Sequence, residues 1–372
     1  MDSVKWCDLP EELWPIIGKF VHSRIDVLRF RSVCSLWRSC CPPLERPPPP
    51  PPPPLPLNFF FAFGAQNHSS LLQSTIYRME SLIDDHQWLV KFEEHPESGK
   101  MRLLDLVTNS LLKHSPESTP KHLTVLEFRV IELRKSYGPS LSFGKSNLSI
   151  NSVHRLVVMP RNHLGFGVAY AIFMIRKDGK LEFARCGDEK LTNVDEQNSH
   201  YHDIIVYKGQ CYVVDKWGII SWVNSALEVI QFSPPLCGFG GQKHLVESCG
   251  DLYAVDQYFE EVSYHHLNQD AEAIGFKVYK LDQEWGKWVN VKDLGDQVFV
   301  LSSDGCFSVS TTEFAGVKGN CILFIDRVPS IPGRTRCHSR VFSLEDGRIR
   351  NLSSSQCSQM VQLPSTWLNN LE

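Results

Sequence analysis

The 372-residue sequence lacks several features that mark particular classes of protein. It has no run of about 18 consecutive apolar residues, so no transmembrane helix is expected. Lys and Arg together number 38 against 42 Asp and Glu. This net charge of −4 provides no excess of basic residues of the kind that binds nucleic acid. We therefore expect neither a nucleic-acid partner nor a membrane partner.

The sequence also lacks a cysteine framework. Its twelve cysteines are scattered, and no two have the C-x-x-C spacing of a zinc ribbon or a thioredoxin-like motif. The first residues, MDSVKWCDLPEELW, carry acids where a secretory signal peptide would need an apolar stretch. We expect residence in the nucleus and/or cytoplasm, where most cysteines stay reduced and act as small apolar core residues.

Signatures of the common enzyme classes are missing as well. No G-x-S-x-G, HExxH or P-loop is present, and the glycine-rich stretches 163–170 and 237–242 lack the G-x-G-x-x-G fingerprint. His200-x-His202-Asp203 could supply metal ligands, because residues two apart on a strand share a face. No further ligand set accompanies them. We predict no catalytic residues, no bound metal and no cofactor.

What the sequence does contain begins with two amphipathic helical stretches in residues 1–45. The apolar stripe of the first comprises Leu13, Ile16, Ile17, Phe20 and Val21. Asp26 can cap the second helix, which Pro42 and Pro43 end. The stripe of the second comprises Phe30, Val33, Cys34, Trp37 and Cys41.

Residues 46–57, RPPPPPPPPLPL, follow as a polyproline segment. In the polyproline II conformation eight prolines extend roughly 25 Å, which predicts a semi-rigid spacer. A ligand for an SH3, WW or profilin-type groove is the alternative. A short helical pair held away by such a spacer needs a surface to cover its stripes, so we expect another protein there. Docking onto the rest of the same chain is the alternative.

Residues 58–372 predict mainly β structure, because short β-branched and aromatic runs alternate with glycine-centred turns. A turn-and-strand pattern repeats: GQCYVVD at 209–215 resembles GDLYAVD at 250–256, and a looser copy starts at Gly295. Periods of 40–50 residues are typical of β-propeller blades, and about six or seven blades would fit. A β-sandwich or a mixed domain is the alternative. Residues 58–150 are the least regular, and 124–138 fit a strand or a helix.

The N-terminal segment resembles an F-box. Residues 8–13, 16–17 and 26–38 match its pattern in order and spacing, including Leu9-Pro10 and the R-S-V-C-x-x-W-R ending at 31–38. The resemblance implies an all-α module that packs against a Skp-type adaptor, which links it to a cullin and a RING protein. The adaptor-binding residues that it implies are Leu9, Pro10, Leu13, Ile16, Ile17, Phe20, Leu28, Val33 and Trp37.

The region from about 160 to 352 is similar to a plant family of SKP-interacting-partner type, in which an F-box precedes a kelch-like β-propeller domain of formerly unknown function. The segments that carry the similarity are 276–281, 288–289, 294–300, 319–324 and 341–347. The sequence departs from the family around residues 84–90. The resulting prediction is an F-box at 1–45, a polyproline linker at 46–57 and a propeller at 58–372.

These resemblances imply a non-catalytic subunit of a Skp adaptor–cullin–F-box (SCF) ubiquitin ligase, whose propeller selects an unknown protein substrate. A scaffold or regulatory binder outside ligases is the main alternative. A propeller enzyme would need a carboxylate or metal cluster at the central channel. Binding residues concentrate on loops of rigid scaffolds. We therefore expect substrate contacts on the loops 233–243 and 256–269, namely Leu236 and Phe239, which look exposed, and the aromatic Tyr258 and Phe259.

Overall fold

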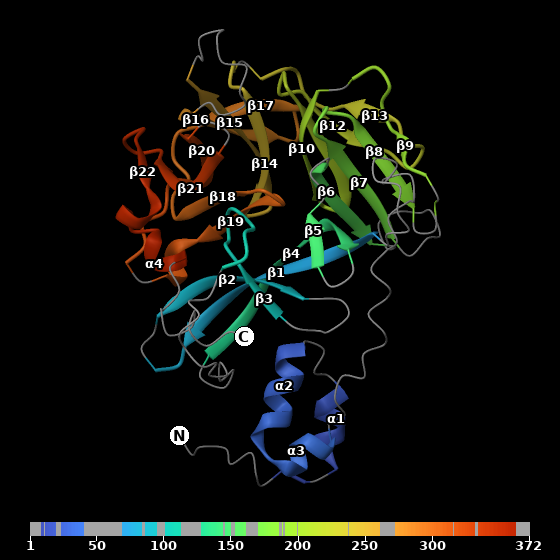
Figure 1. Cartoon of the computed structure of the whole chain (residues 1–372), viewed down its shortest axis with the longest axis vertical. Helices are drawn as coiled ribbons and strands as arrows, with labels where there is room; N and C mark the ends of the chain where they lie inside the picture. Colours follow the sequence, from blue (N-terminus) through green and yellow to red (C-terminus); the bar gives the residue numbers. More distant parts are fainter. Residues whose placement is uncertain are drawn as a thin grey trace.

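A computed structural model of the chain describes three helices followed by five antiparallel-rich sheets (Figure 1). None of its described helices is long and apolar enough to cross a membrane. The described residues are 9–10, 12–19, 24–40, 69–83, 86–94, 101–112, 128–143, 146–149, 153–160, 170–185, 188, 190–198, 200–236, 238–260, 272–314, 316–331 and 334–361.

The N-terminal helices are α1 (Leu13–Lys19), α2 (Arg24–Val33) and α3 (Ser35–Cys40). Pro15 lies in the first turn of α1, where its missing N–H costs no helical hydrogen bond. The single second helix expected up to Cys41 is wrong, because the chain breaks at Cys34. The Cys34 Sγ accepts from the Trp37 N–H at 3.5 Å, as a cap of α3. The break turns Trp37 back toward α1.

The remainder of the described chain is mainly β, as the alternating apolar runs predicted. We call the five sheets blades and number them in chain order. Blade one comprises β1 (Ser69–Ser81), β2 (Gln87–Glu94), β3 (Met101–Leu104), β4 (Phe128–Phe143) and β5 (Ser146–Ser149). Blade two comprises β6 (Val153–Pro160), β7 (Tyr170–Arg176), β8 (Leu181–Arg185) and β9 (Thr192–Asn193).

The next two blades have the same four-stranded meander, and the last has five strands. Blade three comprises β10 (Tyr201–Tyr207), β11 (Gln210–Asp215), β12 (Ile220–Val223) and β13 (Val229–Gln231). Blade four comprises β14 (Gln242–Ser248), β15 (Asp251–Phe259), β16 (Ala273–Asp282) and β17 (Lys287–Val291). Blade five comprises β18 (Gln297–Ser302), β19 (Gly305–Ser310), β20 (Cys321–Ile331), β21 (Arg334–Ser343) and β22 (Ile349–Asn351). Three short helical turns follow β19 and β22: η5 (Thr311–Glu313), η6 (Leu352–Ser354) and α4 (Ser358–Val361).

The five blades close into a ring because each buries apolar side chains against the next (Figure 1). Each seam between neighbouring blades has its own apolar cluster, which covers surface that one sheet could not cover alone. Members of these five clusters are Leu71 and Ile172, Phe173 and Val213, Tyr207 and Leu252, Val255 and Phe299, and Val298 and Ile76. The propeller prediction is confirmed, while its kelch type stays a prediction.

The sequence repeat corresponds to equivalent hairpins of blades three and four. Lys208-Gly209 joins β10 to β11, and Cys249-Gly250 joins β14 to β15, with positive φ at all four residues. Such a pair of positive φ values defines the type I′ turn that suits tight hairpins. The looser copy at Gly295 differs, because the strand after it, β18, runs parallel to β20 and forms its hairpin at its other end.

The expected count of six or seven blades is wrong. The 40–50-residue period holds only for blades two to four, which begin at Val153, Tyr201 and Gln242. Blade one alone extends from Ser69 to Ser149, because β1 and β4 are 13 and 16 residues long. The ambiguous stretch 124–138 is strand β4 from Phe128 onward. The expected domain boundaries and the polyproline segment 46–57 lie outside the described residues.

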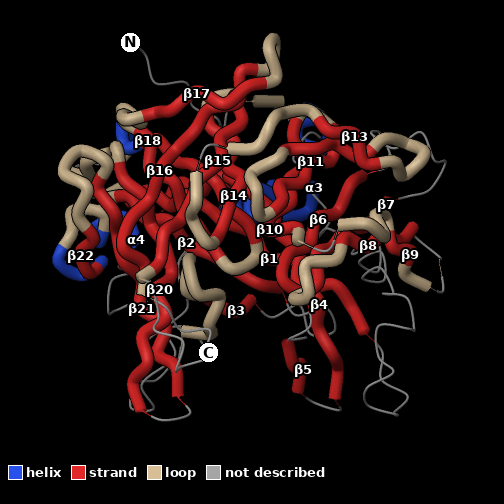
Figure 2. Tube along the Cα trace, turned by 90° about the horizontal axis from the view of Figure 1, so that it is seen from above, coloured by secondary structure: helices blue, strands red, loops and turns tan. Residues whose placement is uncertain are grey.

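Two long hairpins, β4–β5 and β20–β21, extend beyond the other strands on one side of the ring (Figure 2). The ring therefore has one side with raised walls.

Candidate functional site

The three N-terminal helices share a small aromatic core. Trp14 is buried, and its ring centroid lies 4.2 Å from that of Trp37 and 6.4 Å from that of Phe30. Leu9 and Ile17 pack against this cluster. Three predicted adaptor-binding residues, Leu9, Ile17 and Trp37, thus contribute to the core of the module.

A different set of apolar side chains stays exposed on these helices. Ile16 of α1 is 51% exposed and Val33 of α2 is 55% exposed, and Leu13 and Leu36 are exposed as well. Pro10 is exposed just before α1. Of the other predicted adaptor-binding residues, Phe20 lies outside the described residues, as does the side chain of Leu28. The exposed set is the surface that a partner protein would cover.

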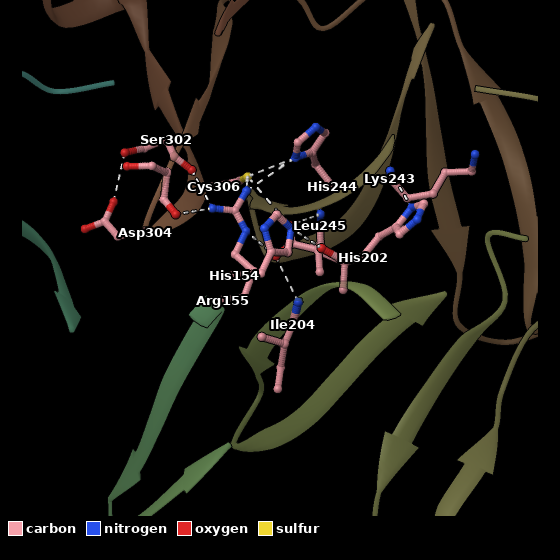
Figure 3. A network of polar contacts seen from close by, with 12 residues as sticks. His154, Arg155, His202, Ile204, Lys243, His244, Leu245, Ser302, Asp304 and Cys306 are labelled. Carbon is pink, nitrogen blue, oxygen red and sulfur yellow. Dashed lines mark hydrogen bonds and ion pairs between the residues drawn. The ribbon is translucent and has the colours of Figure 1, made fainter. Parts of the chain in front are cut away.

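A polar network lies at the centre of the ring (Figure 3). Neighbouring blades contact each other through their inner strands β6, β10, β14 and β19. β6 and β10 each begin with a β-bulge: strand pairing shifts within 153–155 and within 201–203, which leaves His154 and His202 without a residue opposite them. A bulge re-aims the side chains around it, and bulges are frequent near active sites.

Arg155 is the centre of this network. Its Nε atom lies 3.0 Å from Asp203 Oδ1, and its Nη2 atom lies 3.4 Å from His244 Nδ1. Its Nη1 atom donates to the carbonyl oxygens of Ser302 and Ser303 at 2.7 and 2.6 Å. Burial disfavours the charge, but Asp203, Cys306 and Asp304 together outweigh burial and raise the pKa of Arg155 above its ordinary value.

Asp203, His244 and Cys306 have the spacing of a metal site, since their ligand atoms lie within 4.8 Å of one another. The Arg155 guanidinium already supplies the cation, and its Nη2 atom lies 3.7 Å from the Cys306 Sγ. Burial raises the pKa of the Cys306 thiol, which opposes the thiolate that a nucleophilic reaction would need. The three side chains therefore form a structural cluster around a guanidinium.

Blade one joins this centre through the turn between β18 and β19. The Asp304 carboxylate accepts hydrogen bonds from Ser136 Oγ at 2.5 Å and from Ser302 Oγ at 2.8 Å, and it pairs with Lys91 Nζ. Burial alone would raise the pKa of Asp304. Lys91 and the hydroxyl donors outweigh it and hold that pKa well below the usual range.

The histidines of the centre are held neutral. Burial, with Lys243 and His154 nearby, lowers the pKa of His202 to about 4. Burial and the Arg155 charge lower the pKa of His244 to about 4 as well. Both rings are therefore neutral at pH 7 and act as hydrogen-bonding groups.

A cavity of about 1100 Å³ opens beside the network. It is lined by residues of all blades, including His202, Gln242, Gln257 and Phe259. The residues 137–138 of β4 and 324–326 of β20 also line it, and both strands continue past it into the raised hairpins (Figure 2). The cavity thus lies on the walled side of the ring.

The structure brings the two predicted substrate segments together at this cavity. Gly241 packs against the Phe259 ring and Gly238 against the Tyr258 hydroxyl, at distances that leave no room for a Cβ on Gly241. Phe239, between these glycines, is 98% exposed. Tyr258 and Phe259 belong to strand β15 rather than to a loop, and residues 261–269 lie outside the described residues.

The prediction that Leu236 is exposed and contacts a substrate is wrong. It is 6% exposed and packs with Ala254 and Tyr279, and its side chain fills the space above Gly218. The proline pair before it suggested an exposed turn. The backbone instead folds back, because the Leu236 N–H donates to the Trp217 carbonyl at 3.0 Å. Leu236 therefore supports the segment and does not face a partner.

Sequence reasoning missed most of the central network. His202 and Asp203 were noted as metal candidates with His200, yet Asp203 pairs with Arg155 and His200 is exposed. The available signal was the aligned starts of three inner strands: VHRLV from 153, YHDII from 201 and QKHLV from 242. Each has two polar residues before an apolar pair.

Comparison with known proteins places these features in context. A family model for the KIB1-4 β-propeller matches residues 60–347. F-box protein At2g26160 of Arabidopsis thaliana is 30% identical, with 88% of this chain and 97% of the relative covered. F-box protein At4g35733 of the same plant is 29% identical, with 98% and 99% covered. F-box protein SKIP23, also from this plant, is 29% identical, with 86% and 84% covered.

Proposed function

The chain belongs to the plant family of F-box proteins with a KIB1-4 β-propeller, and from this membership we propose that it is the substrate-recognition subunit of an SCF-type ubiquitin ligase. In this proposal the helices bind a Skp-type adaptor, which links them to a cullin and a RING protein. The propeller binds a protein substrate. The chain performs no catalysis and raises the effective concentration of the substrate near the ubiquitin-charged enzyme.

The observation that carries the proposal is that the helical module has two separate sets of apolar side chains, one buried in its core and one exposed on its surface. Trp14, Phe30 and Trp37 form a packed core of their own, so the exposed Ile16 and Val33 are not needed inside the module. Exposed apolar groups on a folded module favour a protein partner. Relatives that match nearly the full chain are named F-box proteins.

The propeller supports the second half of the proposal. Phe239 is exposed two residues before Gly241, which packs against the cavity-lining Phe259, so the propeller offers a rigid surface with an exposed aromatic side chain near its cavity. Aromatic anchors of this kind are frequent centres of protein interfaces. Residues 46–57 would act as the spacer between the two binding surfaces, in the nucleus and/or cytoplasm.

Adaptor binding is the first test. In the full chain, Ile16→Asp with Val33→Asp should reduce capture of a purified Skp-type adaptor by at least about tenfold, since two apolar contacts are lost. The matched control is Ile83→Asp, because Ile83 is an exposed apolar residue of the β1–β2 turn. Unchanged capture by the double variant would contradict the proposal.

Ligase membership is the second test. The chain with its adaptor should recruit cullin and RING protein, and proteins bound to its propeller should accumulate when the proteasome is inhibited. Cullin recruitment without any such accumulation would favour a scaffold or regulatory binder. Adaptor binding without cullin recruitment would favour it too.

A further inference from the structure

His202 presents an unused hydrogen-bond donor to the cavity. Its Nδ1 atom accepts from the Lys243 backbone N–H at 3.2 Å. The neutral ring therefore carries its hydrogen on Nε2. No acceptor for this N–H exists among the described residues, and His202 lines the cavity.

Gln257 presents a second unused donor through a chain of hydrogen bonds. Arg155 Nη2 donates toward His244 Nδ1, so His244 carries its hydrogen on Nε2 and donates to Gln257 Oε1 at 2.9 Å. The amide NH₂ of Gln257 is left to point elsewhere. No acceptor for it exists in the described part of the chain, although Gln257 is buried and lines the cavity.

Gln242 connects the two residues that carry these donors. Gln257 is paired with Gln242 across β14 and β15, and the Gln242 amide nitrogen lies 3.3 Å from the His202 carbonyl oxygen. Gln242 thus bridges the two residues. The segment with Phe239 ends at β14 beside them.

The electrostatics of this corner favour a singly charged anion. Lys243 Nζ pairs with Asp256 Oδ1 at 2.6 Å, and both side chains are fully buried. Arg155 is matched by Asp203 in the same way. Neither of these two buried cations, Lys243 and Arg155, is left free to match a phosphate dianion.

We propose that His202 Nε2 and the Gln257 amide bind a carboxylate of the recognised protein, either its C terminus or an Asp or Glu side chain. This inference rests on the proposed function and names the chemistry of its substrate. Two N–H donors on residues that line one cavity can serve the two oxygens of a carboxylate, and charge-assisted hydrogen bonds of this kind are the stronger ones. Phe239 at the rim contacts the residues that lead to the carboxylate.

The test uses the full chain with its adaptor and three pools of short synthetic peptides of mixed sequence. The first pool has free C termini and no Asp or Glu. The second has amidated C termini and internal Asp and Glu, and the third has amidated C termini and no acid. We expect capture of the first or the second pool to exceed capture of the third by at least about tenfold, and the enriched pool identifies the source of the carboxylate.

Two variants connect this capture to the site. Gln257→Glu keeps the shape and the acceptor for His244 but replaces the donor with a negative charge, so the enrichment should disappear. Gln231→Glu is the matched control, because Gln231 is an exposed residue of β13 away from the cavity lining. If Gln257→Glu lowers the melting temperature, His202→Ala removes the second donor without adding charge and decides the question.

Equal capture of all three pools would overturn the carboxylate inference. So would enrichment that survives in a folded Gln257→Glu or His202→Ala variant. Adaptor capture is measured on the same samples. Failure of the unmodified chain to capture the adaptor counts against the proposed function. Intact adaptor capture together with equal capture of all three peptide pools counts against the carboxylate inference alone.

Discussion

The Nζ atom of Lys91 lies 2.6 Å from the Oδ2 atom of Asp304, and this ion pair joins blade one to blade five. Lys91 is fully buried, and burial lowers its pKa. Lys91→Met should leave Asp304 with an uncompensated charge and lower the free energy of unfolding by about 3–5 kcal/mol. Equilibrium denaturation of the full chain measures this loss.

The control for that loss is the double variant Lys91→Met with Asp304→Asn. It removes both charges, so it should be more stable than the single variant, because replacing a whole buried pair is often close to neutral. A double variant that is less stable than Lys91→Met would show that the pair does not act as a unit.

The free energy of unfolding should decrease as the pH decreases, because His244 is held neutral in the folded chain. Its pKa of about 4 in the folded chain lies below the ordinary 6.5, so the unfolded state binds more protons between these values. The stabilisation is present above pH 6.5 and is lost progressively toward pH 4, by an amount on the order of 3 kcal/mol. His244→Gln should flatten this part of the profile in denaturation experiments at stepped pH.

A profile that is equally steep with and without His244 would assign the acid sensitivity to other groups, such as His202, whose pKa is also lowered to about 4.

Leu236 and Phe239 should respond oppositely to substitution. Leu236→Ala should lower the free energy of unfolding by about 2–4 kcal/mol, because it opens a cavity next to Ala254 and Tyr279. Phe239→Ser should change stability by less than about 0.5 kcal/mol, since the ring is exposed. It should nevertheless weaken substrate capture. A destabilised Phe239→Ser variant would contradict the rim assignment.

Oxidation should crosslink Cys321 of β20 and Cys357, which precedes α4. Their Sγ atoms lie 3.2 Å apart, and the contact with Cys321 lowers the pKa of Cys357. A disulfide here would close a loop of 36 residues and add about 4 kcal/mol on the loop-entropy estimate. Thiol labelling with mass spectrometry, before and after a mild oxidant, detects the bond, and Cys357→Ser is the control. Full labelling of both thiols after oxidation would contradict it.

The sequence predicted the element types well where each strand had a clear alternation and each hairpin a glycine. The hairpins at Gly209 and Gly250 are examples, because their turn type depends on local backbone preferences. The blade count failed because the lengths of β1 and β4 depend on pairing with each other across the chain, which no local pattern encodes.

The central polar network could not be predicted from the sequence for a similar reason. Arg155, Asp203 and His244 come from three different blades, and their meeting depends on ring closure and on two bulges. The burial of Leu236 depends on a single backbone hydrogen bond to Trp217. The break at Cys34 likewise follows from where Trp37 finds its aromatic partners.

The seam that holds Ile76 and Val298 has a consequence for synthesis of the chain. Blade one is the first blade to leave the ribosome. One of its faces is covered by apolar side chains that are synthesised last, including Met360. The ring therefore closes late, through contacts of very high sequence separation, and such contacts fold slowly. Until then the growing chain carries an uncovered apolar face that chaperones would be expected to shield.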